Sequence, residues 1–138
     1  MDNVFVIECK NKNLSKLRQY ITNVLEQVPV DENTSFQLIM AIDELCANII
    51  EHSKISQPDG FIKIELSKKG SCIIVKIIDK GESFNPTHYQ PSDIKDLVKN
   101  RASGGLGLAI VNKFIDKIEY SVQNTLNICT LYKNLSTA

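Results

Sequence analysis

Residues 72–81 read Cys-Ile-Ile-Val-Lys-Ile-Ile-Asp-Lys-Gly, and this stretch decides the architecture expected for the chain. Its apolar side chains fall on both faces of an extended backbone, which is typical of a strand in the interior of a sheet. The run stops at Asp79-Lys80-Gly81, and aspartate and glycine are common in turns. The stretch therefore predicts a central strand that ends with a carboxylate at the rim of the core.

The neighbouring segments predict four further strands. Residues 62–66 alternate apolar and polar side chains and precede a turn at Lys69-Gly70, so they should pair with the central strand as a hairpin. Two alternating segments near the carboxyl end predict a second hairpin, and a short strand opens the chain. These three segments are residues 118–122, 126–132 and 4–8.

Three segments have the apolar spacing of amphipathic helices. They are residues 13–27, 31–53 and 106–117. Asn13 is expected to cap the first helix, the second begins near Asp31 or Asn33, and Phe36 is among the apolar positions of the second. The order of strands and helices predicts an α+β fold, namely a two-layer sandwich with helices on one face of a mostly antiparallel mixed sheet.

The length and composition fit a single domain that spans residues 1–138. From residue 80 to residue 103 the hydrophobicity falls and two prolines appear, Pro86 and Pro91, which indicates a long functional loop. Lysine plus arginine, at 16, balance aspartate plus glutamate, at 16. This balance argues against a nucleic-acid partner and against an anionic membrane surface.

The sequence also indicates a cytoplasmic location. Its first ten residues do not have the basic start and long apolar stretch of a secretory signal, and no run reaches the roughly 18 apolar residues needed to span a bilayer. The four cysteines are widely spaced, so they are expected to be buried reduced thiols, with disulfides as the alternative. They are Cys9, Cys46, Cys72 and Cys129.

Two polar side chains on the second expected helix could address a common ligand. Glu44 and Asn48 are four residues apart and therefore lie on one helix face, and His52 continues the line. An asparagine among apolar neighbours must find hydrogen bonds if it is buried, which invites a functional explanation. The alternative is that the three residues form the solvated stripe of an amphipathic helix.

Two other motifs could bind parts of a nucleotide. Asp79 places an acceptor at the rim of the core, suited to an amino group such as that of adenine, and Gly81 lets a flat ring approach the backbone. Residues 103–108, Ser-Gly-Gly-Leu-Gly-Leu, open the last helix with glycines and free amides that attract phosphate. The first motif could equally be a strand that ends in a turn, and the second a hinge between a loop and a helix.

Taken in order, the three motifs resemble the N box and the two glycine boxes of the GHKL ATPase superfamily. The matching stretches are Glu44-Leu45-Cys46-Ala47-Asn48, Asp79-Lys80-Gly81 and Gly104-Gly105-Leu106-Gly107. The resemblance covers nearly the whole chain and implies a Bergerat-like ATP-binding fold. Residues 41–52 are similar to the anti-sigma-factor serine/threonine kinases of that superfamily.

The resemblance implies a role for each side chain of the first two motifs. Asn48 would hold Mg²⁺, and Glu44 would act as the general base. Asp79 would accept a hydrogen bond from the adenine amino group, and Gly81 would make room for the ring.

The resemblance also implies a lid over the nucleotide, formed by about residues 85–103 together with Gly104. The stretch Gly105-Leu106-Gly107 would contact the phosphates. Arg101 could neutralise the terminal phosphate, and a solvated surface arginine is the alternative.

One departure from the family concerns the last strand. The family often opens this strand with a Gly-Thr pair whose threonine helps to hold the adenine. Here the stretch reads Asn127-Ile128-Cys129-Thr130, and Thr130 is the expected substitute.

By resemblance, the chain is a protein serine/threonine kinase that uses ATP and Mg²⁺ and acts as a partner-switching regulator. The phosphoryl group would pass to a serine of a small antagonist protein, and this antagonist and a sigma factor would compete for the chain. A homodimer is implied as well. The alternatives are a nucleotide-dependent binding module without kinase activity and an ATPase that is coupled to a partner.

Overall fold

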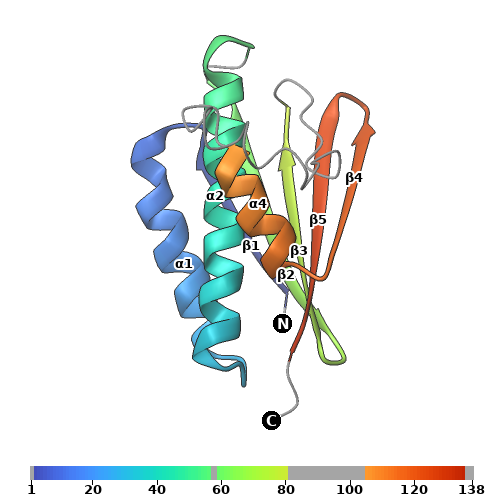
Figure 1. Cartoon of the computed structure of the whole chain (residues 1–138). Helices are drawn as coiled ribbons and strands as arrows, with labels where there is room; N and C mark the ends of the chain where they lie inside the picture. The colour runs from blue at the N-terminus through green and yellow to red at the C-terminus, as the bar shows by residue number, and fades with distance from the viewer. Residues whose placement is uncertain (1, 57–58, 81–104, 136–138) are drawn as a thin grey trace.

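Five strands form a single sheet in the computed structural model, which describes residues 2–56, 59–80 and 105–135 (Figure 1). The strands are β1 (Asp2–Glu8), β2 (Phe61–Lys69), β3 (Cys72–Asp79), β4 (Lys117–Gln123) and β5 (Leu126–Asn134). Their order across the sheet is β1-β2-β3-β5-β4, and all four pairings are antiparallel. The sheet expected to be mixed is therefore antiparallel throughout the described part of the chain.

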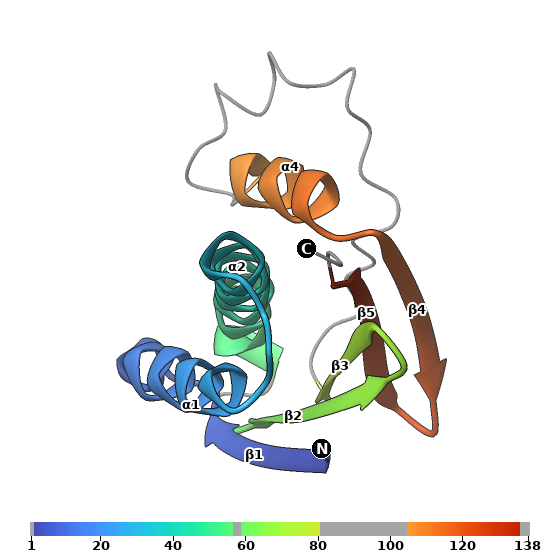
Figure 2. The ribbon, with the colours of Figure 1, turned by 90° about the horizontal axis from the view of Figure 1, so that it is seen from below.

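The helices cover one face of this sheet. They are the 3-10 helix η1 (Asn11–Asn13) and the α-helices α1 (Leu14–Glu26), α2 (Glu32–Ser56) and α4 (Gly105–Phe114). Figure 2 shows α2 between α1 and α4, with all three on the same side of the strands. This arrangement confirms the two-layer α+β sandwich. Among the residues described, no helix is long and apolar enough to cross a membrane.

The core lies between β3, the central strand, and α2. Ile73, Val75 and Ile77 are fully buried beneath the helices, and Asp79 continues their row along the strand. The buried side chains of α2 are Leu38, Ala41, Ile42, Leu45, Cys46 and Ile50. The expectation that Phe36 belongs to this apolar face is wrong, because its side chain is 56% exposed. Phe36 lies two positions before Leu38 and so points roughly 200° away from it around the helix.

The start of α2 agrees with the expected one, whereas the start of α1 and the end of α4 differ from expectation. Asp31 caps α2, since its Oδ1 accepts a hydrogen bond from the backbone N–H of Thr34 at 2.6 Å. Asn13 stands at the start of α1 but makes no capping bond, and its Nδ2 donates instead to the carbonyl of Glu8 at 3.0 Å. Helix α4 ends before residue 117 because Lys117 already begins β4.

Both expected hairpins are present. Gly70, with φ of +61°, lies between β2 and β3, and Asn124 and Thr125, with φ of 50° and 68°, lie between β4 and β5. Positive φ is ordinary for glycine and tolerated by asparagine, whereas a β-branched threonine is strained there. The second turn sets the register in which Asn127 pairs with Val122 on β4.

Candidate active site

Asp79 ends β3 at the rim of the sheet, on the face that the helices cover. It is 7% exposed, and it pairs directly with Asn127 of β5. Asn127 Nδ2 donates to Asp79 Oδ2 at 3.4 Å, and the hydroxyl of Tyr120 on β4 donates to Asn127 Oδ1 at 3.1 Å. A buried carboxylate is tolerated when hydrogen bonds replace its lost hydration, and these side chains contribute to that replacement.

Asn48 is buried in α2, with 7% of its surface exposed. Among the buried side-chain nitrogen and oxygen atoms of the described residues, Asn48 Nδ2 is the one without a hydrogen-bond partner. An orphaned amide of this kind costs about 1–3 kcal/mol, so its presence in a folded chain requires an explanation. The orphaned atom marks a position at which a bound ligand would complete the interior.

Glu44 lies one helical turn before Asn48 and on the same face of α2. Its side chain is partly buried, and this burial raises the pKa of its carboxyl above the ordinary value of a glutamate, with a further increase from the adjacent Asp43. Arg18 of α1 contacts Asp43, with 2.8 Å between Arg18 Nη1 and Asp43 Oδ1. His52, further along the same face, is also partly exposed. Glu44 is thus a carboxylate that holds its proton more strongly than a solvated one does.

Two buried thiols of the core have raised pKa values, and the charge of Asp79 contributes to both increases. The pKa of Cys46, a buried residue of α2, is raised well above its ordinary value, mainly by burial, next by Asp43 and less strongly by groups that include Asp79. Burial and then Asp79 raise the pKa of Cys129 on β5 to about 12. Asp79 belongs to the buried row of β3 that the helices cover, so its carboxylate faces the same interior as these thiols.

Helix α4 begins in the half of the molecule where β3 ends and α2 approaches its last turn (Figure 1). Its first turn is formed by Gly105-Leu106-Gly107, and the start of a helix offers unpaired N–H groups and a positive dipole. Contact of this turn with phosphate stays a prediction. Gly81, Arg101, Gly104 and the expected lid at residues 85–103 lie outside the described residues.

These features agree with a known family. Residues 7–133 match the profile of the histidine kinase-like ATPase domain. The chain belongs to this family. The matched range includes Glu44, Asn48 and Asp79, and it confirms the superfamily that the three sequence motifs indicated.

Known relatives of this histidine kinase-like ATPase domain include serine-protein kinases. The serine-protein kinase RsbW of Bacillus mycoides (strain KBAB4) is 26% identical over 117 residues, which cover 82% of this chain and 72% of the relative. The serine-protein kinase RsbW of Halalkalibacterium halodurans is 22% identical over 117 residues, which cover 82% of this chain and 71% of the relative. Both relatives support the resemblance to anti-sigma-factor kinases.

Two solved structures share the fold of the ATPase domain. The structure of the RsbU and RsbW domains of Rv1364c from Mycobacterium tuberculosis superimposes with a TM-score of 0.73 at 16% identity and covers 100% of this chain and 33% of that one. The histidine kinase AdeS of Acinetobacter baumannii superimposes with a TM-score of 0.52 at 17% identity and covers 98% of this chain and 68% of that one. At these identities the likeness establishes the fold.

Within the ATPase domain, the strand register removes Thr130 from the site and brings in Asn127. Thr130 pairs with Lys76 and Glu119, on the sheet face turned away from the helices. Residues three apart on a strand point to opposite faces, so Thr130 cannot take the place expected for it beside Asp79. Sequence reasoning missed Asn127 because the register between β3 and β5, which places Asn127 opposite Asp79, is set by pairing between segments far apart in the sequence.

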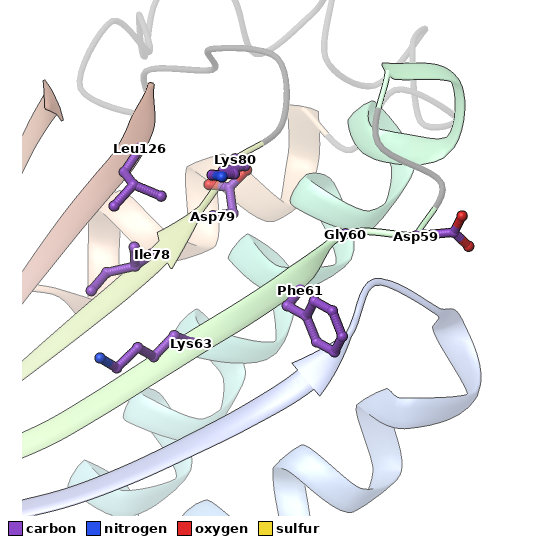
Figure 3. A pocket seen from close by; sticks show the side chains of 8 residues that line it. All are labelled: Asp59, Gly60, Phe61, Lys63, Ile78, Asp79, Lys80 and Leu126. Atoms are coloured by element: carbon purple, nitrogen blue, oxygen red, sulfur yellow. The ribbon is translucent and has the colours of Figure 1, made fainter. Parts of the chain in front are cut away.

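A pocket of about 450 Å³ borders this site at the ends of β2, β3 and β5 (Figure 3). The described residues that line it are Asp59, Gly60, Phe61, Lys63, Ile78, Asp79, Lys80 and Leu126. Figure 3 shows Phe61, Lys63 and Ile78 on the side of the strands away from the helices. The pocket therefore reaches Asp79 from the outer face of the sheet and does not coincide with the helix-covered interior that contains Asn48.

Proposed function

We propose that this chain binds ATP with Mg²⁺ and transfers the terminal phosphoryl group to a serine or threonine of a partner protein. The observation that carries the proposal is the orphaned amide of Asn48, buried on the helix that faces Asp79. Membership of the histidine kinase-like ATPase family supports nucleotide binding, and the RsbW relatives support transfer to serine.

Asp79 is the proposed contact for the adenine base. An ionised carboxylate only accepts hydrogen bonds, so it selects a ligand edge that carries an N–H donor, as the 6-amino group of adenine does. Burial to 7% exposure makes this selection stronger than it would be in water, because an unsatisfied buried acceptor is costly. Gly81 remains the proposed place at which the ring approaches the backbone.

Asn48 is the proposed protein ligand of Mg²⁺. A half-turn of its amide exchanges Nδ2 and Oδ1, so the orphaned position accommodates an oxygen that faces a cation. No group of three or more His, Cys, Asp or Glu side chains suited to a metal occurs in the described part of the chain. A single amide oxygen nevertheless suits Mg²⁺, which usually completes its coordination with water and phosphate oxygens. When bound, the ion neutralises negative charge on those oxygens.

Glu44 is the proposed general base. As the acceptor hydroxyl attacks, the bond from its oxygen to the terminal phosphorus forms, the bond from that phosphorus to the ADP oxygen breaks, and the hydroxyl proton passes to the Glu44 carboxylate. The raised pKa of Glu44 makes it a stronger base than a solvated glutamate. The start of α4 at Gly105-Leu106-Gly107 would supply backbone N–H groups to the phosphates, with Gly104, Arg101 and the lid closing over them.

We further propose that the phosphate acceptor is a serine of a small antagonist protein, and that this antagonist and a sigma factor compete for the chain. The two RsbW relatives, which this chain matches over 72% and 71% of their length, support this assignment. Action as a homodimer in the cytoplasm belongs to the same proposal.

The test is a Glu44→Gln variant, assayed with radiolabelled ATP and candidate antagonist domains. Transfer should fall by about 10²- to 10⁴-fold, while the dissociation constant for MgATP should stay within about threefold of the wild-type value. Glu26→Gln, which removes an exposed carboxylate at the end of α1, is the matched control and should change neither quantity. Equal losses of binding and transfer in Glu44→Gln would contradict the role as base.

The same assay separates the alternative functions. Tight binding of MgATP by the wild type, without transfer to any acceptor, would favour a binding module whose conformation depends on nucleotide. Rapid hydrolysis without a partner would favour an ATPase.

A further inference from the structure

A short relay of hydrogen bonds reaches Asp79 from the edge of the sheet. It starts at the Tyr120 hydroxyl on the edge strand β4, passes through the Asn127 amide on β5, and ends at the Asp79 carboxylate on β3. Tyr120 is partly buried, and Asn127 and Asp79 are 5% and 7% exposed. The relay therefore crosses three neighbouring strands on the side that faces the helices.

The chemistry of the three groups fixes the direction of the relay. The carboxylate only accepts, so the amide must turn its Nδ2 toward Asp79 and its Oδ1 toward Tyr120. Tyr120 must then act as a donor. A hydrogen bond to one end of an amide polarises the other end, so the tyrosine strengthens the bond that Asn127 donates to Asp79 at 3.4 Å.

We propose that Tyr120 and Asn127 are positioning residues that make the site selective for 6-aminopurine nucleotides. They hold the Asp79 carboxylate in the orientation that receives the amino group of the base. This inference rests on the proposed function, because it takes Asp79 as the contact for adenine. It adds two side chains that do not touch the base and affect its binding by orienting Asp79.

A purely structural role for the relay makes a different prediction. If Tyr120 and Asn127 only stabilised the sheet, their loss would weaken all nucleotides alike, through partial loss of the folded state. If they orient Asp79, their loss weakens only ligands whose base bears the amino group. The ratio of two dissociation constants separates these cases.

The experiment measures binding of ATP, purine riboside triphosphate and inorganic tripolyphosphate to the full chain by calorimetry in the presence of Mg²⁺. The second ligand does not carry the 6-amino group, and the third does not carry a base. Wild type should prefer ATP to purine riboside triphosphate by about 10- to 100-fold, as expected for a hydrogen bond to a charged group. Tyr120→Phe should reduce this preference by about 3- to 10-fold and leave the affinity for the other two ligands unchanged.

The chain offers a matched control in Tyr132→Phe. Tyr132 lies on β5 and its hydroxyl also contacts a carboxylate, that of Glu119, but on the opposite face of the sheet. This variant should leave the preference for ATP unchanged. Because Tyr120 acts through Asp79, the effect of Tyr120→Phe should also vanish in an Asp79→Asn background.

The possible results separate the relay from the proposed role of Asp79 in binding adenine. An unchanged preference in Tyr120→Phe, or equal losses for the three ligands, overturns the relay while the preference of the wild type still supports Asp79 as the adenine contact. If the wild type binds none of the nucleotides, the proposed function and the relay fail together. Asn127→Leu is the second variant, and it should reduce the preference more than Tyr120→Phe does because it removes the bond to Asp79 itself.

Discussion

Two buried polar side chains on the helix side of the sheet differ in their hydrogen bonding: one has partners within the chain and the other has an atom without a partner among the described residues. Lys133, 9% exposed on β5, donates through Nζ to Gln37 Oε1 at 2.7 Å and to the carbonyl of Phe114 at 2.5 Å. Asn48 is buried to a similar extent and leaves Nδ2 without a partner in the described part of the chain. The end of the interior at Lys133, called the closed end below, is satisfied by the chain itself. The end at Asn48, called the open end, is the one at which a ligand is proposed to bind.

At the closed end, the hydrogen bonds of Lys133 connect three elements of the fold. Lys133 links β5 to α2 through Gln37 and to the last turn of α4 through Phe114. A cation at the end of a helix complements its dipole and occupies a carbonyl that has no partner within the helix. Lys133 therefore contributes to stability, and the unpartnered amide of Asn48 is consistent with the role in binding proposed for it.

Asn48→Leu should reduce the affinity for nucleotide strongly and should not destabilise the fold. The affinity for MgATP should fall by about 100-fold or more, which corresponds to about 2.7 kcal/mol. The free energy of unfolding should stay equal or rise by about 1 kcal/mol, because the substitution removes an orphaned buried amide. Calorimetric titration and urea denaturation measure the two quantities.

A loss of stability in Asn48→Leu with unchanged affinity would reverse the assignment. Asn112→Leu is a suitable control, because Asn112 is an exposed residue of α4 whose Nδ2 donates to the carbonyl of Leu108 in the same helix. This control should change neither quantity by much.

Lys133→Met should show the opposite pattern at the closed end. The free energy of unfolding should fall by about 2 kcal/mol, because Gln37 and the Phe114 carbonyl lose their donor while methionine keeps most of the buried stem. The dissociation constant for MgATP should change by less than about threefold. A large loss of affinity without loss of stability would mean that the closed end takes part in binding.

The smallest change is expected in the pH dependence of transfer, which the charges near Glu44 set. As the proposed base, Glu44 must have lost its proton before transfer, so the rate should fall as the pH drops through its pKa. Burial, and next Asp43, raise this pKa above the ordinary value of a glutamate. Asp43→Asn removes one of these causes and should move the acid limb of the pH profile down by about half a pH unit. Arg18→Met removes the counter-charge of Asp43 and should move the limb up. Shifts in the same direction for both variants would exclude the electrostatic explanation.

The sequence predicted the features that depend on residues close together along the chain. The apolar run ending at Asp79 identified the central strand, and the four-residue spacing of Glu44 and Asn48 identified one helix face. These features depend on periodicity and on turn residues, which a single sequence displays.

What the sequence could not predict depends on pairing between distant residues. Thr130 and Asn127 are three residues apart, and only the register with β3 shows which of them faces Asp79. Phe36 fits an apolar pattern, yet it projects away from the sheet because the buried face of α2 is centred elsewhere. The orphaned state of Asn48 likewise follows from the packing around it, which no local pattern encodes.

The length of the turn at Asn124 and Thr125 limits which insertions and deletions the chain can accept during evolution. Side chains alternate along a strand, so the gain or loss of one residue in this turn would slip β4 against β5 and send Tyr120 to the far face. In the relay proposed above, substitutions would alter the orientation of Asp79 by degrees, whereas a single insertion would remove the Tyr120 hydroxyl from the relay. The length of this hairpin is thus a requirement of the proposed selectivity for the base, although no atom of the turn belongs to the relay.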